Sequence, residues 1–158
     1  MIIEMSIKID FYNINDIEDY LLKFAVIAAK YEDKWIYCRH KERHTYEIPG
    51  GHRELGEVIL DTAKRELYEE TGAIEYNLSP ICAYSVSRDD AVRDNVPSYG
   101  LLCYAEVIKL DTLPADMEMA EITFWDDLPE KLTYPHIQPS LYQKVKEYLE
   151  DVVDSYES

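Results

Sequence analysis

Three glutamates with helical spacing are the part of this sequence best suited to chemistry. Glu69 and Glu70 follow Glu66 by three and four positions, so on a helix the carboxylates share one face. They come near the C-terminal end of the predicted helix, where the dipole is negative, and their mutual repulsion adds to this cost. A divalent cation would offset both effects, and carboxylate oxygens suit Mg²⁺ or Mn²⁺ rather than zinc. A solvated helix face is the alternative interpretation.

Two neighbouring features favour the metal site. Asp61, Arg65 and Glu69 follow one another at intervals of four residues, and such a ladder of ion pairs offsets part of the repulsion. Upstream, Gly50 and Gly51 form a turn whose missing β-carbons let backbone carbonyls approach an ion closely. The sequence therefore predicts a site in which helix carboxylates and a carbonyl of this turn hold the cation.

The helix that carries these glutamates is predicted over residues 57–71. Leu60, Ala63 and Leu67 form an apolar stripe at helical spacing, and Gly72 stands where a helix often ends in a left-handed residue. Strands are expected at 5–12, 24–30, 35–39, 78–86, 99–107 and 121–125, with a short extended piece at 46–48. A hairpin turn is expected at 31–34, a short helix or loop at 15–22, and a second helix at 139–153. Strands interleaved with two helices indicate the α/β class, with a mixed sheet covered on both faces.

Composition and charge exclude several classes of function. The chain has 158 residues, enough for one domain with a core, and 47% of them are hydrophobic. Its 32 acidic and 16 basic residues give a formal charge of −16, which disfavours a nucleic-acid polymer as partner. The sequence shows neither an apolar run long enough for a membrane span nor a signal segment, so we expect a cytoplasmic protein. Three cysteines without a C-x-x-C pair predict reduced, buried thiols.

A longer pattern surrounds the glutamates, from residue 51 to residue 73. It matches G-x5-E-x7-R-E-U-x-E-E-x-G-U, where U is aliphatic, at every fixed position, and in this it resembles the Nudix box. Seven specified residue types would recur by chance on the order of once in 10⁸ starting points at average composition. Residues 46–50 resemble the usual lead-in of that family, and residues 121–129 resemble its late strand.

The resemblance implies a fold, a reaction and a set of site residues. The fold would be a Nudix-type α/β/α sandwich with a mixed β-sheet between helices, formed by residues 1–158 as a single domain. The reaction would be hydrolysis of a diphosphate linkage in a nucleotide, with Mg²⁺ or Mn²⁺ as cofactor. Glu66 or a later acid would activate the attacking water, and Glu57 and Arg65 would support the helix and its ligands. The implied metal ligands are Glu66, Glu69, Glu70 and a carbonyl of Gly50 or Gly51.

A basic patch at residues 39–44 precedes the glycine turn. Arg39 or Arg43 could grip a phosphate, because the guanidinium fork fits phosphate oxygens, and Arg53 is a further candidate. A solvated hairpin end is the alternative. Glu118 or Glu121 could add a ligand or a base, with a surface position as the alternative, and His136 is interpreted as a cap or loop residue.

The substrate expected from these features is a small nucleotide. One small domain with a negative field and a single basic patch predicts a nucleoside triphosphate, cut to monophosphate and pyrophosphate. This resembles the branch of the family that removes oxidised nucleotides. Nucleotide sugars, dinucleoside polyphosphates and a Nudix-fold regulator without turnover are the alternatives. A calcium-binding protein is disfavoured because no D-x-D-x-D-G loop occurs. The oligomeric state is left open.

Overall fold

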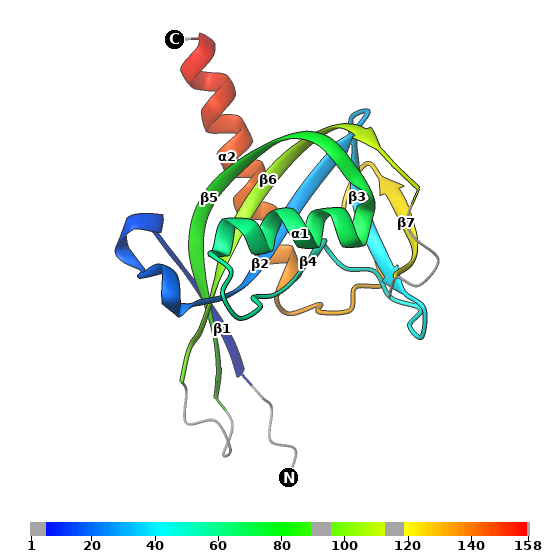
Figure 1. Cartoon of the computed structure of the whole chain (residues 1–158). Coiled ribbons are helices and arrows are strands. Elements are labelled where there is room, and N and C mark those ends of the chain that lie inside the picture. The colour runs from blue at the N-terminus through cyan, green and yellow to red at the C-terminus, as the bar shows by residue number, and fades with distance from the viewer. Residues whose placement is uncertain (1–5, 90–95, 113–118, 158) are drawn as a thin grey trace.

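The computed structural model describes residues 6–89, 96–112 and 119–157, which form a three-layer sandwich (Figure 1). A seven-stranded sheet is the middle layer. Helix α1 (Ile59–Thr71) packs on one face, and the first half of α2 (Gln138–Glu157) packs on the other, while the end of α2 projects past the sheet. The predicted fold class, an α/β/α sandwich with a mixed sheet between helices, is confirmed.

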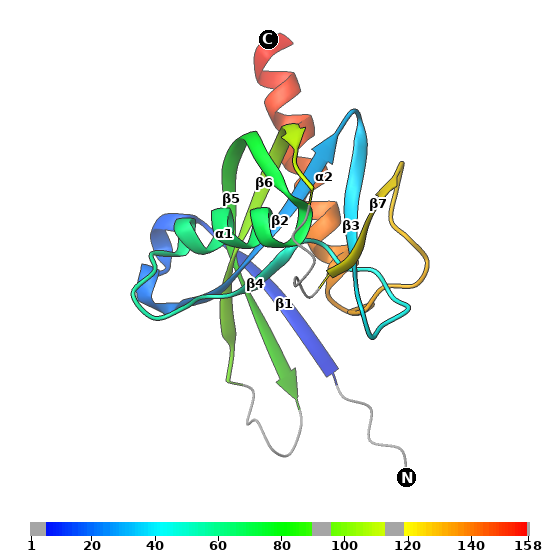
Figure 2. The same ribbon diagram turned by 45° about the vertical axis from the view of Figure 1, so that its right-hand side comes forward.

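One parallel strand pair lies within an otherwise antiparallel sheet. The strand order is β1-β5-β6-β2-β3-β7, with β4 paired to β2. Strands β2 and β6 run parallel, and the other named pairs are antiparallel. Figure 2 shows the paired ends of β1 and β5 extending beyond the helices. The strands are β1 (Ser6–Tyr12), β2 (Leu22–Tyr31), β3 (Lys34–His40), β4 (Gly50–His52), β5 (Ala73–Asp89), β6 (Ser98–Leu110) and β7 (Met119–Trp125).

Strand β2 contributes to both cores of the sandwich. Successive side chains of a strand point to opposite faces of the sheet. Ala25, Ile27 and Ala29 therefore pack beneath α1, whereas Val26 and Ala28 pack on the α2 side. Because helices cover both faces, residues 24–29 are a continuous apolar run rather than an alternating one.

Helix α1 buries the face that the sequence predicted, with a shift at its start. Ala63 and Leu67 are fully buried. Leu60 is only half-buried, and Ile59 takes the inner position instead. The helix begins at Ile59, not at residue 57, so its first turn presents a different side chain to the sheet.

Gly72 ends helix α1, as predicted. Its φ of 78° is left-handed, and its N–H donates to the Tyr68 carbonyl at 2.8 Å. A β-carbon at this position would lie 2.3 Å from the Asp111 carbonyl oxygen, so the backbone conformation and the packing both require glycine. The chain then passes directly into β5, which holds the end of the helix against the sheet.

The predicted hairpin between β2 and β3 is confirmed. Glu32 and Asp33 both have positive φ, 50° and 65°, and form the two-residue turn between the antiparallel strands. Residues 15–22 contribute two short 3-10 helices, Ile14–Asp16 and Asp19–Leu21. The short extended piece expected at 46–48 forms isolated bridges, from Tyr46 to Leu132 and from Glu47 to Cys38.

Strands β5 and β6 are longer than the sequence indicated. They reach 17 and 13 residues, against the expected ranges 78–86 and 99–107. Cross-strand pairing continues from Ala73 opposite Leu110 to Val86 opposite Ser98, with irregularities in register along the way. Long-range pairing therefore extends both strands through polar residues. Helix α2 likewise continues to Glu157, four residues past the predicted end at 153.

Two further expectations concern the membrane and the thiols. No helix within residues 6–89, 96–112 and 119–157 combines the length and the apolar character that a membrane span needs.

Cys38, Cys82 and Cys103 are buried and unpaired, as predicted. Burial raises the pKa of Cys82 to about 11 and that of Cys103 to about 12, so neither is a thiolate at neutral pH.

Leu67 provides a test of the packing between α1 and the sheet. Its side chain is fully buried, so Leu67→Ala should lower the free energy of unfolding by about 2–5 kcal/mol, through lost burial and the cavity left behind. Urea unfolding followed by circular dichroism measures this change. Lys64→Ala, exposed on the same helix, is the control and should stay within about 0.5 kcal/mol of wild type. Equal effects of both variants would contradict the packing described.

Candidate active site

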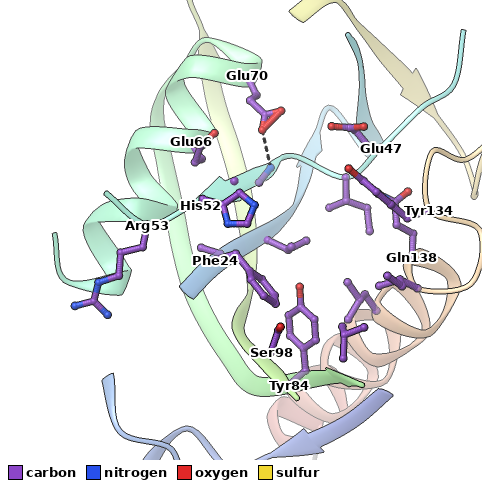
Figure 3. A pocket seen from close by; sticks show the side chains of 18 of the residues that line it. Phe24, Glu47, His52, Arg53, Glu66, Glu70, Tyr84, Ser98, Tyr134 and Gln138 are labelled. Carbon is purple, nitrogen blue, oxygen red and sulfur yellow. Dashed lines mark hydrogen bonds between the residues drawn. The ribbon is translucent and has the colours of Figure 1, made fainter. Parts of the chain in front are cut away.

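A cavity of about 950 Å³ opens beside α1, β4 and the start of α2 (Figure 3). Its volume lies within the usual range for small-molecule sites. One part of its wall carries carboxylates and guanidinium groups. Another part carries aromatic and aliphatic side chains from β2, β5 and α2, among them Phe24, Tyr84 and Leu141. Such a cavity can hold an ionic group against one wall and a planar ring against the other.

The second half of α1 supplies three carboxylates to the polar wall. Glu66, Glu69 and Glu70 all line the cavity, as their helical spacing predicted. Glu70 is 6% exposed, whereas the side chains of Glu66 and Glu69 are 13% and 38% exposed. The cluster therefore runs from a buried carboxylate to one that solvent reaches.

Glu70 has one bound oxygen and one unpaired oxygen. Its Oε1 accepts a hydrogen bond from the Gly50 N–H at 3.0 Å, the dashed line in Figure 3. Its Oε2 is buried and receives no hydrogen bond from a donor group of the described residues. The carboxyl group of Glu66 lies close enough to share a proton with Glu70 when one of the two is protonated. Burial, with a further contribution from the charges of Glu66 and Glu47, raises the pKa of Glu70 well above its usual value. A buried anionic oxygen without a partner is costly, and a divalent cation is a partner that suits it.

Gly51 lets β4 lie directly against Glu66. A β-carbon on residue 51 would come within 2.3–2.6 Å of the carboxylate atoms of Glu66, so any other residue would push the two apart. The sequence predicted a turn here, but Gly50 and Gly51 lie in strand β4. The hydrogen bond from this segment to the cluster is made by the Gly50 N–H, and a carbonyl ligand from Gly50 or Gly51 stays a prediction. The three carboxylates offer only oxygen donors, a set that fits Mg²⁺ or Mn²⁺.

Arg65 binds the carboxylates together. Its Nη1 donates to Glu66 at 2.7 Å and to Glu69 at 3.1 Å, and its Nε donates to Glu57 at 2.7 Å. Nη2 donates to the carbonyl of His52 at 2.9 Å, which ties α1 to the end of β4. One guanidinium thus positions two cavity carboxylates and the neighbouring strand.

Arg65 pairs with Glu57 instead of the predicted partner Asp61. The predicted pair of Arg65 with Glu69 is present, but within the described residues Arg65 forms no ion pair with Asp61. The hydrogen bond from Arg65, supported by the Glu54 N–H and the Thr62 hydroxyl, lowers the pKa of Glu57 to about 2. Glu57 is therefore ionised at neutral pH. It lies outside the cavity lining, on the far side of Arg65.

Glu47 is a buried carboxylate at the site that sequence reasoning missed. It is 7% exposed, and His40 Nε2 lies 2.8 Å from its Oε1 while Arg43 Nη1 donates to Oε2 at 3.3 Å. Donor atoms of His40, Glu47 and Glu70 lie within 4.8 Å of one another. The signal in the sequence was an acid between apolar neighbours in the run 46–48.

The two arginines of the basic patch lie in different places, Arg43 at the cavity and Arg39 beside strand β7. Arg43 lines the cavity, and its hydrogen bond with Tyr134 raises the pKa of its guanidinium. Arg39 does not line the cavity. Its Nε donates at 2.9 Å to Glu121, which lies directly opposite on β7. The structure thus brings one of the two patch arginines to the site.

Arg53 lines the cavity with its stem while its guanidinium binds elsewhere. It donates to the Asp19 carboxylate at 2.7 Å and to the Glu57 carbonyl at 2.7 Å, and Figure 3 shows it directed away from the other labelled side chains. His136 is exposed and lies outside the cavity lining. The second possible acid, Glu118, lies outside the described residues.

A match to a family model identifies the family of this chain. The model of the NUDIX domain matches residues 21–145, so the chain belongs to the Nudix family, as the box predicted. A putative 8-oxo-dGTP diphosphatase, YtkD of Bacillus subtilis, is 29% identical over 112 residues. A probable DHNTP pyrophosphohydrolase of Lactococcus lactis is 43% identical over 54 residues. These matches cover 70% and 34% of this chain, which spans only 66% and 32% of the length of the two relatives.

Solved structures share the fold. A mutant of the pyrophosphohydrolase BsRppH of Bacillus subtilis superposes with a TM-score of 0.71 at 22% identity, covering 90% of each chain. An Ap4A hydrolase of C. elegans superposes with a TM-score of 0.60 at 19% identity, covering 82% of this chain and 99% of the other. At these identities the likeness extends to the fold and not to the substrate.

The contacts of Arg65 lead to a prediction for stability and cation binding. Arg65→Ala removes the counter-charge from Glu57, Glu66 and Glu69, and it should lower the free energy of unfolding by about 1–3 kcal/mol. It should also weaken Mg²⁺ binding. Arg65→Lys restores the charge without the fork and should recover only part of both losses. Urea unfolding and calorimetric titration with Mg²⁺ measure the two effects. If Arg65→Lys has the stability and the Mg²⁺ affinity of the wild type, the hydrogen bonds of the guanidinium do not hold the carboxylates in place.

The unpaired oxygen of Glu70 predicts that stability depends on pH and metal. In metal-free buffer at pH 7, Glu70→Gln should raise the free energy of unfolding by about 1–3 kcal/mol, because it removes the cost of burying this carboxyl as an anion or of protonating it on folding. The folded-state pKa is raised, so the wild type loses stability as pH rises from about 4 through that pKa. The difference in stability between Glu70→Gln and the wild type should therefore vanish at about pH 4.

Thermal melts with EDTA and with Mg²⁺ measure this effect. Mg²⁺ should raise the Tm of the wild type and leave Glu70→Gln almost unchanged. Glu69→Gln is the control, because the Glu69 side chain is 38% exposed and its charge costs less. A Glu70→Gln variant less stable than wild type in EDTA at pH 7 would contradict the prediction.

Proposed function

We propose that this chain is a Mg²⁺- or Mn²⁺-dependent diphosphatase that cuts a nucleoside triphosphate to the monophosphate and pyrophosphate. The observation that carries the proposal is the buried, unpaired carboxylate oxygen of Glu70, beside Glu66 and Glu69, in a cavity whose other wall is apolar. The polar wall suits a cation and phosphates, and the apolar wall suits a base. Membership of the Nudix family supports the reaction type.

Glu66, Glu69 and Glu70 would hold the cation, together with a carbonyl of Gly50 or Gly51. When bound, the cation would neutralise phosphate charge and lower the pKa of an attacking water. Glu66 or Glu69 would accept the proton from that water, since both line the cavity. Arg65 would keep Glu66 and Glu69 oriented through its two hydrogen bonds from Nη1.

Arg43 is our choice for the residue that binds phosphate. It lines the cavity, and its side chain is 47% exposed, so its unused donors are within reach of a substrate. Arg39 and Arg53 were also predicted to bind substrate. Their guanidinium groups already contact Glu121 and Asp19, so we expect a smaller contribution from each.

The choice of a free triphosphate rests on two supports. The matched relative YtkD is named a putative 8-oxo-dGTP diphosphatase, which is a triphosphate activity. The formal charge of −16 disfavours a nucleic-acid polymer and favours a small substrate screened by cations. A cytoplasmic location, where such nucleotides occur, stays a prediction.

A substrate panel with Mg²⁺ tests the proposal. We expect dGTP and 8-oxo-dGTP to be cut with release of pyrophosphate, and with higher kcat/KM than ADP-ribose or diadenosine tetraphosphate. Excess EDTA should abolish turnover, and Glu70→Gln should lower kcat by about 100-fold or more. Preference for ADP-ribose or the dinucleotide would overturn the substrate assignment alone. Absence of turnover on the whole panel would favour a regulatory Nudix module, and full activity in EDTA would exclude the metal mechanism.

A further inference from the structure

Gln138, the first residue of α2, carries a second unpaired buried oxygen in the same cavity. The residue is 5% exposed and lines the cavity, and its Oε1 has no hydrogen-bond partner among the described residues. Among the described residues, Glu70 Oε2 and Gln138 Oε1 are the only buried side-chain nitrogen or oxygen atoms without a hydrogen-bond partner. An amide oxygen buried without a partner is unfavourable, and a ligand that donates a hydrogen bond relieves the cost.

The surroundings of Gln138 suit a planar ring. Phe24 and Tyr84 pack edge to face with ring centroids 5.4 Å apart, and both line the cavity. Ile137 and Leu141, next to Gln138 in the chain or one turn further along α2, add aliphatic surface. Figure 3 shows Gln138 on the α2 side of the cavity and Glu66 on the α1 side. The amide thus stands in the apolar wall, apart from the carboxylates.

We propose that Gln138 selects the base of the substrate. Its side chain would turn the enclosed Oε1 toward the cavity, where this oxygen would accept a hydrogen bond from an N–H group on the edge of a purine held against Phe24 and Tyr84. The inference rests on the proposed triphosphatase function. Apolar contact discriminates weakly between rings of similar shape, whereas a buried polar group that must be satisfied discriminates strongly. The hydroxyl of Tyr134, another polar group of the lining, already bonds to Arg43. Gln138 Oε1 is the buried acceptor of this wall that has no donor among the described residues.

The test compares three triphosphates that differ at the edge of the base. dGTP and dATP each present an N–H donor, whereas the triphosphate of 2′-deoxynebularine has an unsubstituted purine without one. The wild type should cut dGTP or dATP with kcat/KM about tenfold or more above the nebularine analogue. Gln138→Leu keeps the approximate volume and removes the acceptor, so it should bring the ratio close to one, mainly through KM.

Two further variants separate recognition from folding. Gln138→Leu should melt at or above the wild-type Tm, because it removes an unpaired buried oxygen. Gln138→Glu keeps an acceptor oxygen and should keep the preference for dGTP over the nebularine analogue. Gln143→Leu is the matched control: the same change on the same helix, at an exposed position outside this cavity, should leave the ratio unchanged.

The outcomes distinguish this inference from the function on which it rests. A wild type that cuts all three triphosphates equally overturns the role of Gln138 and leaves the diphosphatase standing. The same holds if Gln138→Leu lowers kcat/KM for all three by one common factor. A wild type that cuts no triphosphate overturns the proposed function and this inference together. A ratio that collapses in Gln138→Leu and persists in Gln138→Glu and Gln143→Leu establishes it.

Discussion

The excess of carboxylates around one guanidinium is the constraint on which the site depends. Arg65 contacts Glu57, Glu66 and Glu69, and Glu70 lies beyond its reach with one oxygen unpaired. A single positive charge cannot balance this cluster near the negative end of a helix. The fold tolerates the imbalance because α1 is fixed by its buried face and by Gly72 at its end. A bound cation would complete the balance, so the predicted instability without metal and the proposed affinity for metal have the same origin.

The sheet determines which part of the cavity the carboxylates of α1 face. Gly50 and Gly51 lie in β4, paired to β2, and they bring backbone against Glu70 and Glu66 with no side chain between. The cavity then continues past β2 to β5 and the first turn of α2. The helix with the carboxylates and the helix with Gln138 lie on opposite faces of the sheet, yet both contribute to one cavity.

The cavity has a carboxylate wall and an apolar wall, which come from different elements. This separation explains why the fold and the Nudix box do not define the substrate. Proteins of this fold include a pyrophosphohydrolase, an Ap4A hydrolase and a UDP-X diphosphatase, all with TM-scores of 0.60 or above to this chain. A carboxylate wall that holds a cation is common to reactions on any diphosphate. We propose that the apolar wall, with Phe24, Tyr84 and Gln138, distinguishes one nucleotide from another.

Local spacing was enough to predict the arrangement of the carboxylates on α1. Glu66, Glu69 and Glu70 share a helix face whatever surrounds the helix, and Gly72 ends it for reasons contained in a few residues, so both predictions held. Pairings over long distances were not readable in this way. Which patch arginine reaches the cavity depends on β7, where Glu121 lies opposite Arg39. Glu47, Tyr84 and Gln138 meet at the cavity only because distant strands and α2 pack together. The sequence by itself determined the carboxylate face of α1 and the family. The tertiary structure decided which side chains form the apolar wall of the cavity, because helical periodicity is local and packing is not.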